Sequence, residues 1–190
     1  MNQESVTSQI EARAKAWAGA ADAIADDVAS AAGLVIESLA AGGKLLLFGN
    51  GGSAADAQHV AAEFVVRFRK DRQAYAAVAL TTDTSVLTAC ANDYGYEQVF
   101  SRQVEALLSA GDVVIALSTS GRSKNVIEAV RVAREMGGKT VSCIGSDLDS
   151  PLKELSDVTI SVPVSTTDQI QEMHSAALHI LCDRVEEALS

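Results

Sequence analysis

The sequence predicts a three-layer α/β/α fold, in which a five-stranded parallel sheet is flanked by helices and preceded by an N-terminal helical extension. From residue 42 onward, short apolar runs alternate with longer segments of helical periodicity, and this alternation is typical of a parallel sheet covered on both faces. The 190 residues, 48% of them hydrophobic, suffice to bury one core without disulfides or structural metals. We therefore expect a helical segment over 1–41, followed by one α/β domain over 42–190.

The individual elements follow from the spacing of apolar residues. Residues 5–41 are rich in alanine, and larger apolar side chains recur among them near helical spacing. Strands are expected at 44–48, 76–81, 112–117, 139–144 and 157–162, and helices at 53–68, 95–109, 123–136 and 167–188. Because parallel sheets bind ligands at the carboxyl ends of their strands, the functional residues should lie in the loops that follow the strands.

Composition excludes several classes of partner. The formal net charge is −10 and the sequence pI is near 4.7, whereas nucleic acid or an anionic membrane would require a basic surface. No run approaches the roughly 18 apolar residues of a membrane span, and no charged leader precedes an apolar stretch. Cys90, Cys143 and Cys182 are widely spaced, which is typical of reduced core thiols. We expect a soluble, cytoplasmic protein that binds neither nucleic acid nor membrane.

Residues 44–63, KLLLFGNGGSAADAQHVAAE, begin with a pattern typical of a phosphate-binding loop. The apolar run predicts a buried strand, Gly49, Gly51 and Gly52 predict a tight turn, and Ser53 is expected to be the N-cap of the next helix. Unpaired N–H groups at a helix start attract anions. This loop is therefore a candidate phosphate site.

The same predicted helix carries a second feature. His59 and Glu63 are four residues apart, so both side chains lie on one face of the helix. This spacing suits two ligands of one metal ion or an acid/base pair. One helix would then serve both a phosphate and the chemistry, which favours an enzyme acting on a small phosphorylated molecule.

A second loop follows the apolar run VVIALS and carries four hydroxyl groups ahead of a helix that begins near Asn125. The four residues are Ser118, Thr119, Ser120 and Ser123. Hydroxyl and amide donors bind a phosphate dianion without any lysine, which suits an acidic protein. The alternative is that these side chains only cap the helix. Four hydroxyls exceed what one cap uses, so we favour phosphate binding.

The last predicted helix contains a third group of polar residues, Asp168, Gln171, His174 and His179. Gln171 and His179 are eight residues apart, about 12 Å of helical rise, so both would reach one metal only with extended side chains. His174 lies three residues from Gln171 and is a rival ligand on spacing alone.

Four motifs in this order resemble the phosphoheptose isomerases, a family of sugar isomerase (SIS) domain proteins. The motifs are GNGGSAADAQH-x3-E, AND at 91–93, STSG-x-S at 118–123 and QEMH-x4-H at 171–179. The resemblance implies a flavodoxin-like SIS fold and a homotetramer with active sites at subunit interfaces, in which the N-terminal helical segment also packs. It also implies one zinc ion per subunit. The implied reaction converts D-sedoheptulose 7-phosphate to D-glycero-D-manno-heptose 7-phosphate through an enediol, the first step toward nucleotide-activated heptose for bacterial surface polysaccharide such as lipopolysaccharide.

The resemblance also assigns roles to individual residues. It implies that Glu63 is the catalytic base and His179 the acid. The implied metal ligands are His59, Glu63, Gln171 and His179. The implied substrate-binding residues are Asn50, Gly51, Gly52, Ser53, Glu63, Asn92, Asp93, Ser118, Thr119, Ser120, Ser123, Asp168 and Gln171.

Two other functions fit parts of the pattern. Non-catalytic SIS proteins that bind the replication initiator share the glycine loop, but their hydroxyl loop resembles STRG, so Ser120, Glu63 and His179 favour the enzyme. A nicotinamide dehydrogenase is suggested because 49–54 fits G-x-G-x-x-A after a strand. No acidic residue ends the next strand about 20 positions further on, which argues against that function.

Overall fold

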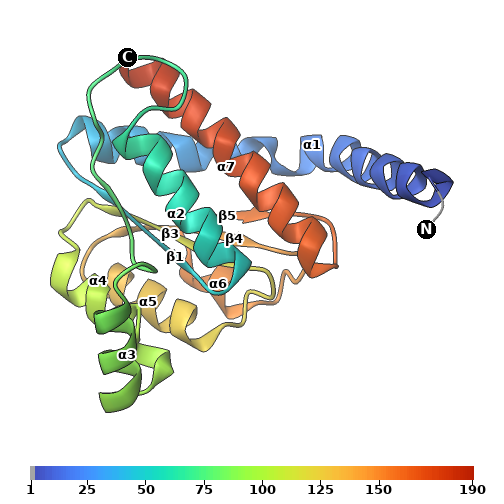
Figure 1. Ribbon diagram of the computed structural model, residues 1–190. Helices are drawn as coiled ribbons and strands as arrows, with labels where there is room; N and C mark the ends of the chain where they lie inside the picture. Colours follow the sequence, from blue (N-terminus) through green and yellow to red (C-terminus); the bar gives the residue numbers. More distant parts are fainter. Residues whose placement is uncertain (1–2) are drawn as a thin grey trace.

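The structure is a computed structural model that describes residues 3–190, and it contains one five-stranded parallel sheet (Figure 1). The strands are β1 (Leu45–Gly49), β2 (Ala77–Ala79), β3 (Val113–Ser118), β4 (Lys139–Ile144) and β5 (Val158–Ser161), in the order β2-β1-β3-β4-β5. The helices are α1 (Gln3–Ala40), α2 (Gly52–Val65), α3 (Thr84–Asp93), α4 (Ser101–Leu107), α5 (Lys124–Glu135), α6 (Pro151–Leu155) and α7 (Thr167–Leu189), with a 3-10 turn η1 (Tyr96–Gln98). The predicted three-layer α/β/α fold is confirmed.

The two faces of the sheet carry separate apolar cores, as the sequence of β1 illustrates. Leu45 and Leu47 face the core formed with α1, α2 and α7, whereas Leu46 and Phe48 face the core formed with α4, α5 and α6. All four side chains are fully buried, and each contributes about 1.5–3 kcal/mol through burial. A strand buried on both faces is continuously apolar, which is why these runs predicted a parallel sheet.

Helix α1 has two parts with different surroundings. From Ala20 onward, a stripe of its residues is buried in the core shared with α2 and α7. The preceding part projects beyond the body of the molecule (Figure 1) and carries the exposed apolar residues Val6 and Ile10. None of the helices within residues 3–190 is long and apolar enough to cross a membrane.

The segment between β2 and β3 differs from the prediction of one helix over 95–109. The structure has three elements in this segment, α3, η1 and α4. Gly95 has a φ of 96°, a left-handed conformation that interrupts the helical path. Helix α3 escaped prediction because Cys90 is its single buried residue, so it has no apolar stripe to detect.

The sheet order places two loops side by side. Strand β1 lies between β2 and β3, with Gly49 opposite Leu117 at the carboxyl ends of β1 and β3. The connections that leave β1 and β3 therefore diverge from one point, and such a point in a parallel sheet forms a crevice that binds ligands. The glycine loop and the hydroxyl loop both begin here.

The cysteines take no part in the loops at this crevice. Cys90, Cys143 and Cys182 are all buried and unpaired, as expected for core thiols. Burial raises the pKa of both Cys143 and Cys182 to about 12, which leaves them protonated and unreactive at neutral pH.

Candidate active site

A cavity of about 240 Å³ lies between the loops after β1 and β3 and the start of α7. It is lined by Asn50, Gly51, Gly52, Ser53, Leu117, Ser118, Thr119, Ser123, Thr167 and Gln171. Apart from Leu117 and Thr167, all of these belong to the set predicted to bind substrate. Three segments that are distant in sequence therefore meet at one small polar cavity.

The glycine loop reaches this cavity through two glycines with different constraints. Gly51 has a φ of 57°, a region that side chains other than glycine rarely adopt. At Gly52 a Cβ would lie 2.6 Å from Oε1 of Gln171, so a side chain there would displace the Gln171 amide. The close contact with Gln171 thus joins the beginning of α2 to the beginning of α7.

The start of α2 differs from the prediction in one detail. The N-cap is Gly51, not Ser53, because the left-handed turn lets the helix begin at Gly52. The N–H groups of Ser53 and Ala54 donate back to the carbonyl oxygens of Asn50 and Gly51, both at 3.1 Å. The N–H groups of Gly51 and Gly52 have no acceptor within residues 3–190, so they remain available to an anion.

In the hydroxyl loop after β3, the side chains do more than cap helix α5. Ser118 Oγ and Ser123 Oγ lie 2.9 Å apart. Ser123 is the N-cap of α5, yet its side chain makes no capping hydrogen bond, so the alternative that these hydroxyls only cap the helix fails at this position. Ser120 is exposed and its Oγ accepts from the N–H of Arg122 at 3.2 Å; it does not line the cavity.

A pair of amides, which the sequence did not reveal, joins the two loops. Asn50 Nδ2 donates to Asn125 Oδ1, and Asn125 Nδ2 donates to Asn50 Oδ1, each at 2.9 Å. The hydroxyl of Tyr96 also donates to Asn50 Oδ1 at 3.1 Å. Asn125 is almost fully buried, so this reciprocal pair anchors the two loops at one spacing.

A second group of side chains, the His59–Glu63–His179 cluster, lies further along α2 and α7. Ligand atoms of these three residues all lie within 4.8 Å of one another. His59 Nε2 is 3.1 Å from Glu63 Oε1, and the rings of His59 and His179 are 4.9 Å apart at an interplanar angle of 76°. The ring of Phe68 stacks on His179 at 5.7 Å.

The cluster fits a divalent cation such as zinc. Zinc prefers nitrogen and carboxylate oxygen ligands at about 2 Å in tetrahedral geometry, and two imidazoles with one carboxylate supply three such donors. Glu63 is 21% exposed and His59 49% exposed, so the cluster is open to an incoming molecule. A fourth position would remain for solvent, substrate or another ligand.

Asp56 lies beside this cluster and was missed by the sequence analysis. It precedes His59 by three residues on α2, so it shares that face of the helix. Burial raises the pKa of Asp56, although His59, a hydrogen bond from Ser175 and His179 act in the opposite direction. A carboxylate near ligating imidazoles commonly orients them.

Gln171, the fourth predicted ligand, lies with the cavity and not with the cluster. Its amide contacts the backbone at Gly52. On α7 it precedes His179 by eight residues, about 12 Å of rise. Within one chain, the structure therefore divides the predicted ligand set between two places.

Three other predicted substrate-binding residues lie outside the cavity. Asn92 and Asp93 are exposed at the end of α3, where Asn92 Nδ2 donates to Asp93 Oδ1 at 2.7 Å. Asp168 is exposed at the start of α7 and forms an ion pair with Arg13 of α1. All three residues are exposed on the surface of the protomer.

His174 is a core residue, and its prediction as a rival ligand is wrong. It is fully buried, with Nε2 3.0 Å from the carbonyl oxygen of Ile144. Burial lowers its pKa to about 4, against the opposing effect of the bond to Ile144. The ring is thus neutral at pH 7, with Nε2 as the donor, and Nδ1 is buried without a partner in the described residues.

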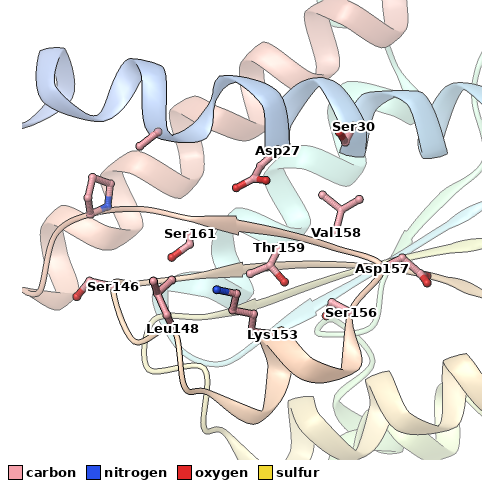
Figure 2. A pocket seen from close by; sticks show the side chains of 12 residues that line it. Asp27, Ser30, Ser146, Leu148, Lys153, Ser156, Asp157, Val158, Thr159 and Ser161 are labelled. Atoms are coloured by element: carbon pink, nitrogen blue, oxygen red, sulfur yellow. The ribbon is translucent and has the colours of Figure 1, made fainter.

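A further cavity of about 610 Å³ lies away from the loops, along the outer edge of β5 between α1 and α6. Figure 2 shows Asp27 of α1 and Lys153 of α6 among its walls, together with Thr159 and Ser161 of β5. None of the predicted site residues lines it. The candidate site is therefore identified by the residues that line the smaller cavity, and not by cavity size.

Comparisons with known proteins give one consistent result. The family model for the SIS domain matches residues 9–145. The phosphoheptose isomerase of Geobacter sulfurreducens is 50% identical over 186 residues, which cover 98% of each chain. That of Paramagnetospirillum magneticum is 58% identical over 151 residues, which cover 80% of this chain and 78% of the relative.

Solved structures agree with the sequence relatives. A phosphoheptose isomerase from Neisseria gonorrhoeae superposes with a TM-score of 0.91 at 44% identity, covering 97% of this chain and 98% of the other. One from Francisella tularensis has a TM-score of 0.93 at 32% identity, covering 98% and 100%.

The neutral, buried His174 predicts acid sensitivity of the fold. Because the pKa falls from 6.5 unfolded to about 4 folded, the unfolded state binds more protons between these values, and stability decreases as pH falls through that window. The full contribution is about 3 kcal/mol. Urea unfolding at pH 7 and pH 4 should show a smaller pH-dependent loss for His174→Gln than for the unmodified protein; equal losses would contradict this account.

Proposed function

This chain belongs to the phosphoheptose isomerase family of SIS-domain proteins and is an aldose–ketose isomerase acting on sedoheptulose 7-phosphate, and we propose that Glu63 and His179 carry out the proton transfers. The observation that supports these roles is the meeting of Glu63 on α2 with His179 on α7 in one cluster. The loops after β1 and β3 would hold the phosphate, through the N–H groups of Gly51 and Gly52 and the nearby hydroxyls.

The reaction moves a carbonyl between C2 and C1 of the sugar. The Glu63 carboxylate would take a proton from C1 of the ketose, and the electron pair left behind would form the double bond of an enediol. His179 would give a proton to the carbonyl oxygen and accept one from the neighbouring hydroxyl. Return of the proton from Glu63 to C2 yields D-glycero-D-manno-heptose 7-phosphate, with no net gain or loss of protons.

The residues that would hold one zinc ion per subunit are His59, Glu63 and His179; Gln171, the fourth ligand that the family resemblance implies, lies at the cavity within one chain and would reach this cluster from a neighbouring subunit. When bound, zinc would polarise the substrate carbonyl as a Lewis acid. A carboxylate that coordinates a metal is a weaker base, so Glu63 is expected to act as base when its coordination is loose.

The two halves of the site are separated along α2 and α7 within one subunit. Eleven residues separate Gly52 from Glu63 on α2, about 16 Å of helical rise, which exceeds the phosphate-to-carbonyl span of a heptose phosphate. Gln171 and His179 are separated in the same way on α7. We infer that the phosphate loops of one subunit face the His59–Glu63–His179 cluster of another.

A homotetramer would provide such interfaces. The projecting part of α1 carries Val6 and Ile10 with 45% and 62% of their surface exposed, and an apolar helix face of this kind is suited to contact with other subunits. We propose the division into an N-terminal helical segment, 1–41, and a SIS domain, 42–190. Asn92, Asp93 and Asp168 are exposed in the protomer and would be available to a substrate at such an interface.

The product also suggests a place in metabolism. A heptose phosphate is the raw material for nucleotide-activated heptose, so we propose that the enzyme works in the cytoplasm and supplies surface polysaccharide such as lipopolysaccharide. The two alternative functions are less well supported, because the relatives compared above are phosphoheptose isomerases over most of their length. A replication-initiator regulator would not need Glu63 and His179 together.

Replacing the proposed base tests the mechanism. Glu63→Gln should lower the turnover of sedoheptulose 7-phosphate about 100-fold or more, because general base catalysis contributes at least that much. NMR detection of the aldose product measures it. Glu187→Gln changes an exposed carboxylate on α7 that pairs with Arg184 and should leave turnover unchanged. Near-normal turnover by Glu63→Gln would exclude Glu63 as the base.

Removing the second imidazole tests the metal site. His179→Ala should lose zinc on purification as well as activity, because it removes a ligand and the proposed acid together. His59→Ala should also lose zinc but keep the acid, so the two variants separate these contributions. Elemental analysis of each purified protein gives the zinc content; a full zinc complement in His179→Ala would contradict its role as ligand.

Mixing two inactive variants tests the shared site. Ser118→Asp places a negative charge in the phosphate cavity, whereas Glu63→Gln removes the base. If each site combines two subunits, unfolding and refolding the variants together should restore about a quarter of normal turnover by random assembly. Sites contained within one subunit would give no restoration. Analytical ultracentrifugation of the mixture confirms reassembly.

A further inference from the structure

The segment that follows α2, residues 66–76, is attached to α7 by one buried carboxylate. Glu186 accepts hydrogen bonds from the N–H groups of Phe68, Arg69 and Lys70 at 3.1, 2.8 and 2.9 Å. Three successive N–H groups that point to one anion form a strong binding site. The Glu186 side chain is 3% exposed, so these bonds are shielded from water.

Arg72 completes this attachment and extends it to α2. Its Nε donates to Glu186 Oε1 at 3.1 Å, and its side chain is 5% exposed. Its Nη2 donates to the carbonyl oxygen of Glu63 at 2.7 Å, and Nη1 to that of Phe64 at 3.0 Å. The guanidinium therefore holds the last turn of α2 by the backbone of Glu63 itself.

The electrostatics of the Arg72–Glu186 pair favour a fixed geometry. Burial opposes ionisation of Glu186, but the three N–H donors and Arg72 outweigh it and lower the pKa of Glu186. A buried ion pair is stable only with such additional hydrogen bonds, and removal of one partner is strongly destabilising. The pair thus links α7, the segment after α2, and α2.

Both ends of this link reach the proposed proton-transfer groups. On one side, Arg72 binds the backbone of Glu63. On the other, Glu186 binds the backbone of Phe68, whose ring stacks on His179 at 5.7 Å with an interplanar angle of 25°. A small displacement of either group would change the approach to the sugar carbonyl.

We propose that Arg72 and Glu186 are positioning residues for the isomerase, which act through the Glu63 backbone and through Phe68 to set the relative placement of Glu63 and His179. This inference rests on the proposed function. To that function, the inference adds a buried ion pair that would contact neither the substrate nor the metal. Arg72 and Glu186 should affect the chemical step and leave phosphate binding unchanged.

Glu186→Gln tests this with a change of one atom. The amide keeps the shape of the side chain but presents N–H groups to N–H donors, so the attachment weakens. The expected result is a kcat reduced about 10- to 100-fold, as for a small misplacement of reacting groups, with unchanged KM and unchanged inhibition by inorganic phosphate. Hydrogen exchange of the amides of residues 68–70, followed by mass spectrometry, should become faster.

Two comparisons separate positioning from general damage. Asp183→Asn makes the same kind of change one turn earlier on α7, where the exposed Arg69 is the partner, and should leave kcat unchanged. Asn125→Ala loosens the phosphate loops and should instead raise KM and weaken inhibition by inorganic phosphate. A lower kcat for Glu186→Gln and a higher KM for Asn125→Ala would indicate that the two residues position different parts of the site.

Phe68 provides a test that does not depend on how Glu186→Gln folds. Phe68→Leu removes the ring from His179 and leaves the Arg72–Glu186 pair intact, so kcat should fall with unchanged KM, and Phe68→Tyr should restore it. Suppose that the unmodified protein isomerises the sugar and Glu63→Gln does not. If folded Glu186→Gln or Phe68→Leu then keeps a normal kcat, the positioning role is wrong while the proposed function stands. An unmodified protein without isomerase activity would overturn both.

Discussion

The parallel packing of α2 beside α7 on one face of the sheet is the constraint on which the whole site depends. Helix α2 and the segment after it contact α7 at three successive levels. Gly52 meets Gln171 at their beginnings, His59 meets His179 near the middle, and the segment after α2 binds Glu186 near the end of α7. Seven residues on α2 and eight on α7 separate the first two levels. The spacing of the contacts is therefore nearly equal along the two helices.

The sheet places this pair of helices over the cavity where we propose that the phosphate binds. Strands β1 and β3 end together, and the reciprocal amides of Asn50 and Asn125 hold their loops at one spacing. The cavity offers N–H and hydroxyl donors and no cationic side chain. A protein with a net charge of −10 would thus bind a dianion through local hydrogen-bond donors, without attraction by its overall charge.

The sequence predicted what depends on local pattern and spacing. The apolar runs located the five strands, and the separation of His59 and Glu63 placed both on one helix face. Contacts between distant segments were not predictable in this way: the Gln171 amide lies against Gly52, and the left-handed turn at Gly51 starts the helix ahead of Ser53. Asn125 and Glu186 resemble ordinary helix residues in sequence, and only the structure reveals their burial and their contacts with other elements.

A crystal structure of the Glu63→Gln variant with sedoheptulose 7-phosphate bound would test the central claim most directly. The account predicts the phosphate between the loops after β1 and β3, and the carbonyl end of the sugar beside position 63 and His179 of a neighbouring subunit. A phosphate bound elsewhere, for example in the cavity along β5, would contradict it. So would a carbonyl remote from position 63 and His179 in every subunit.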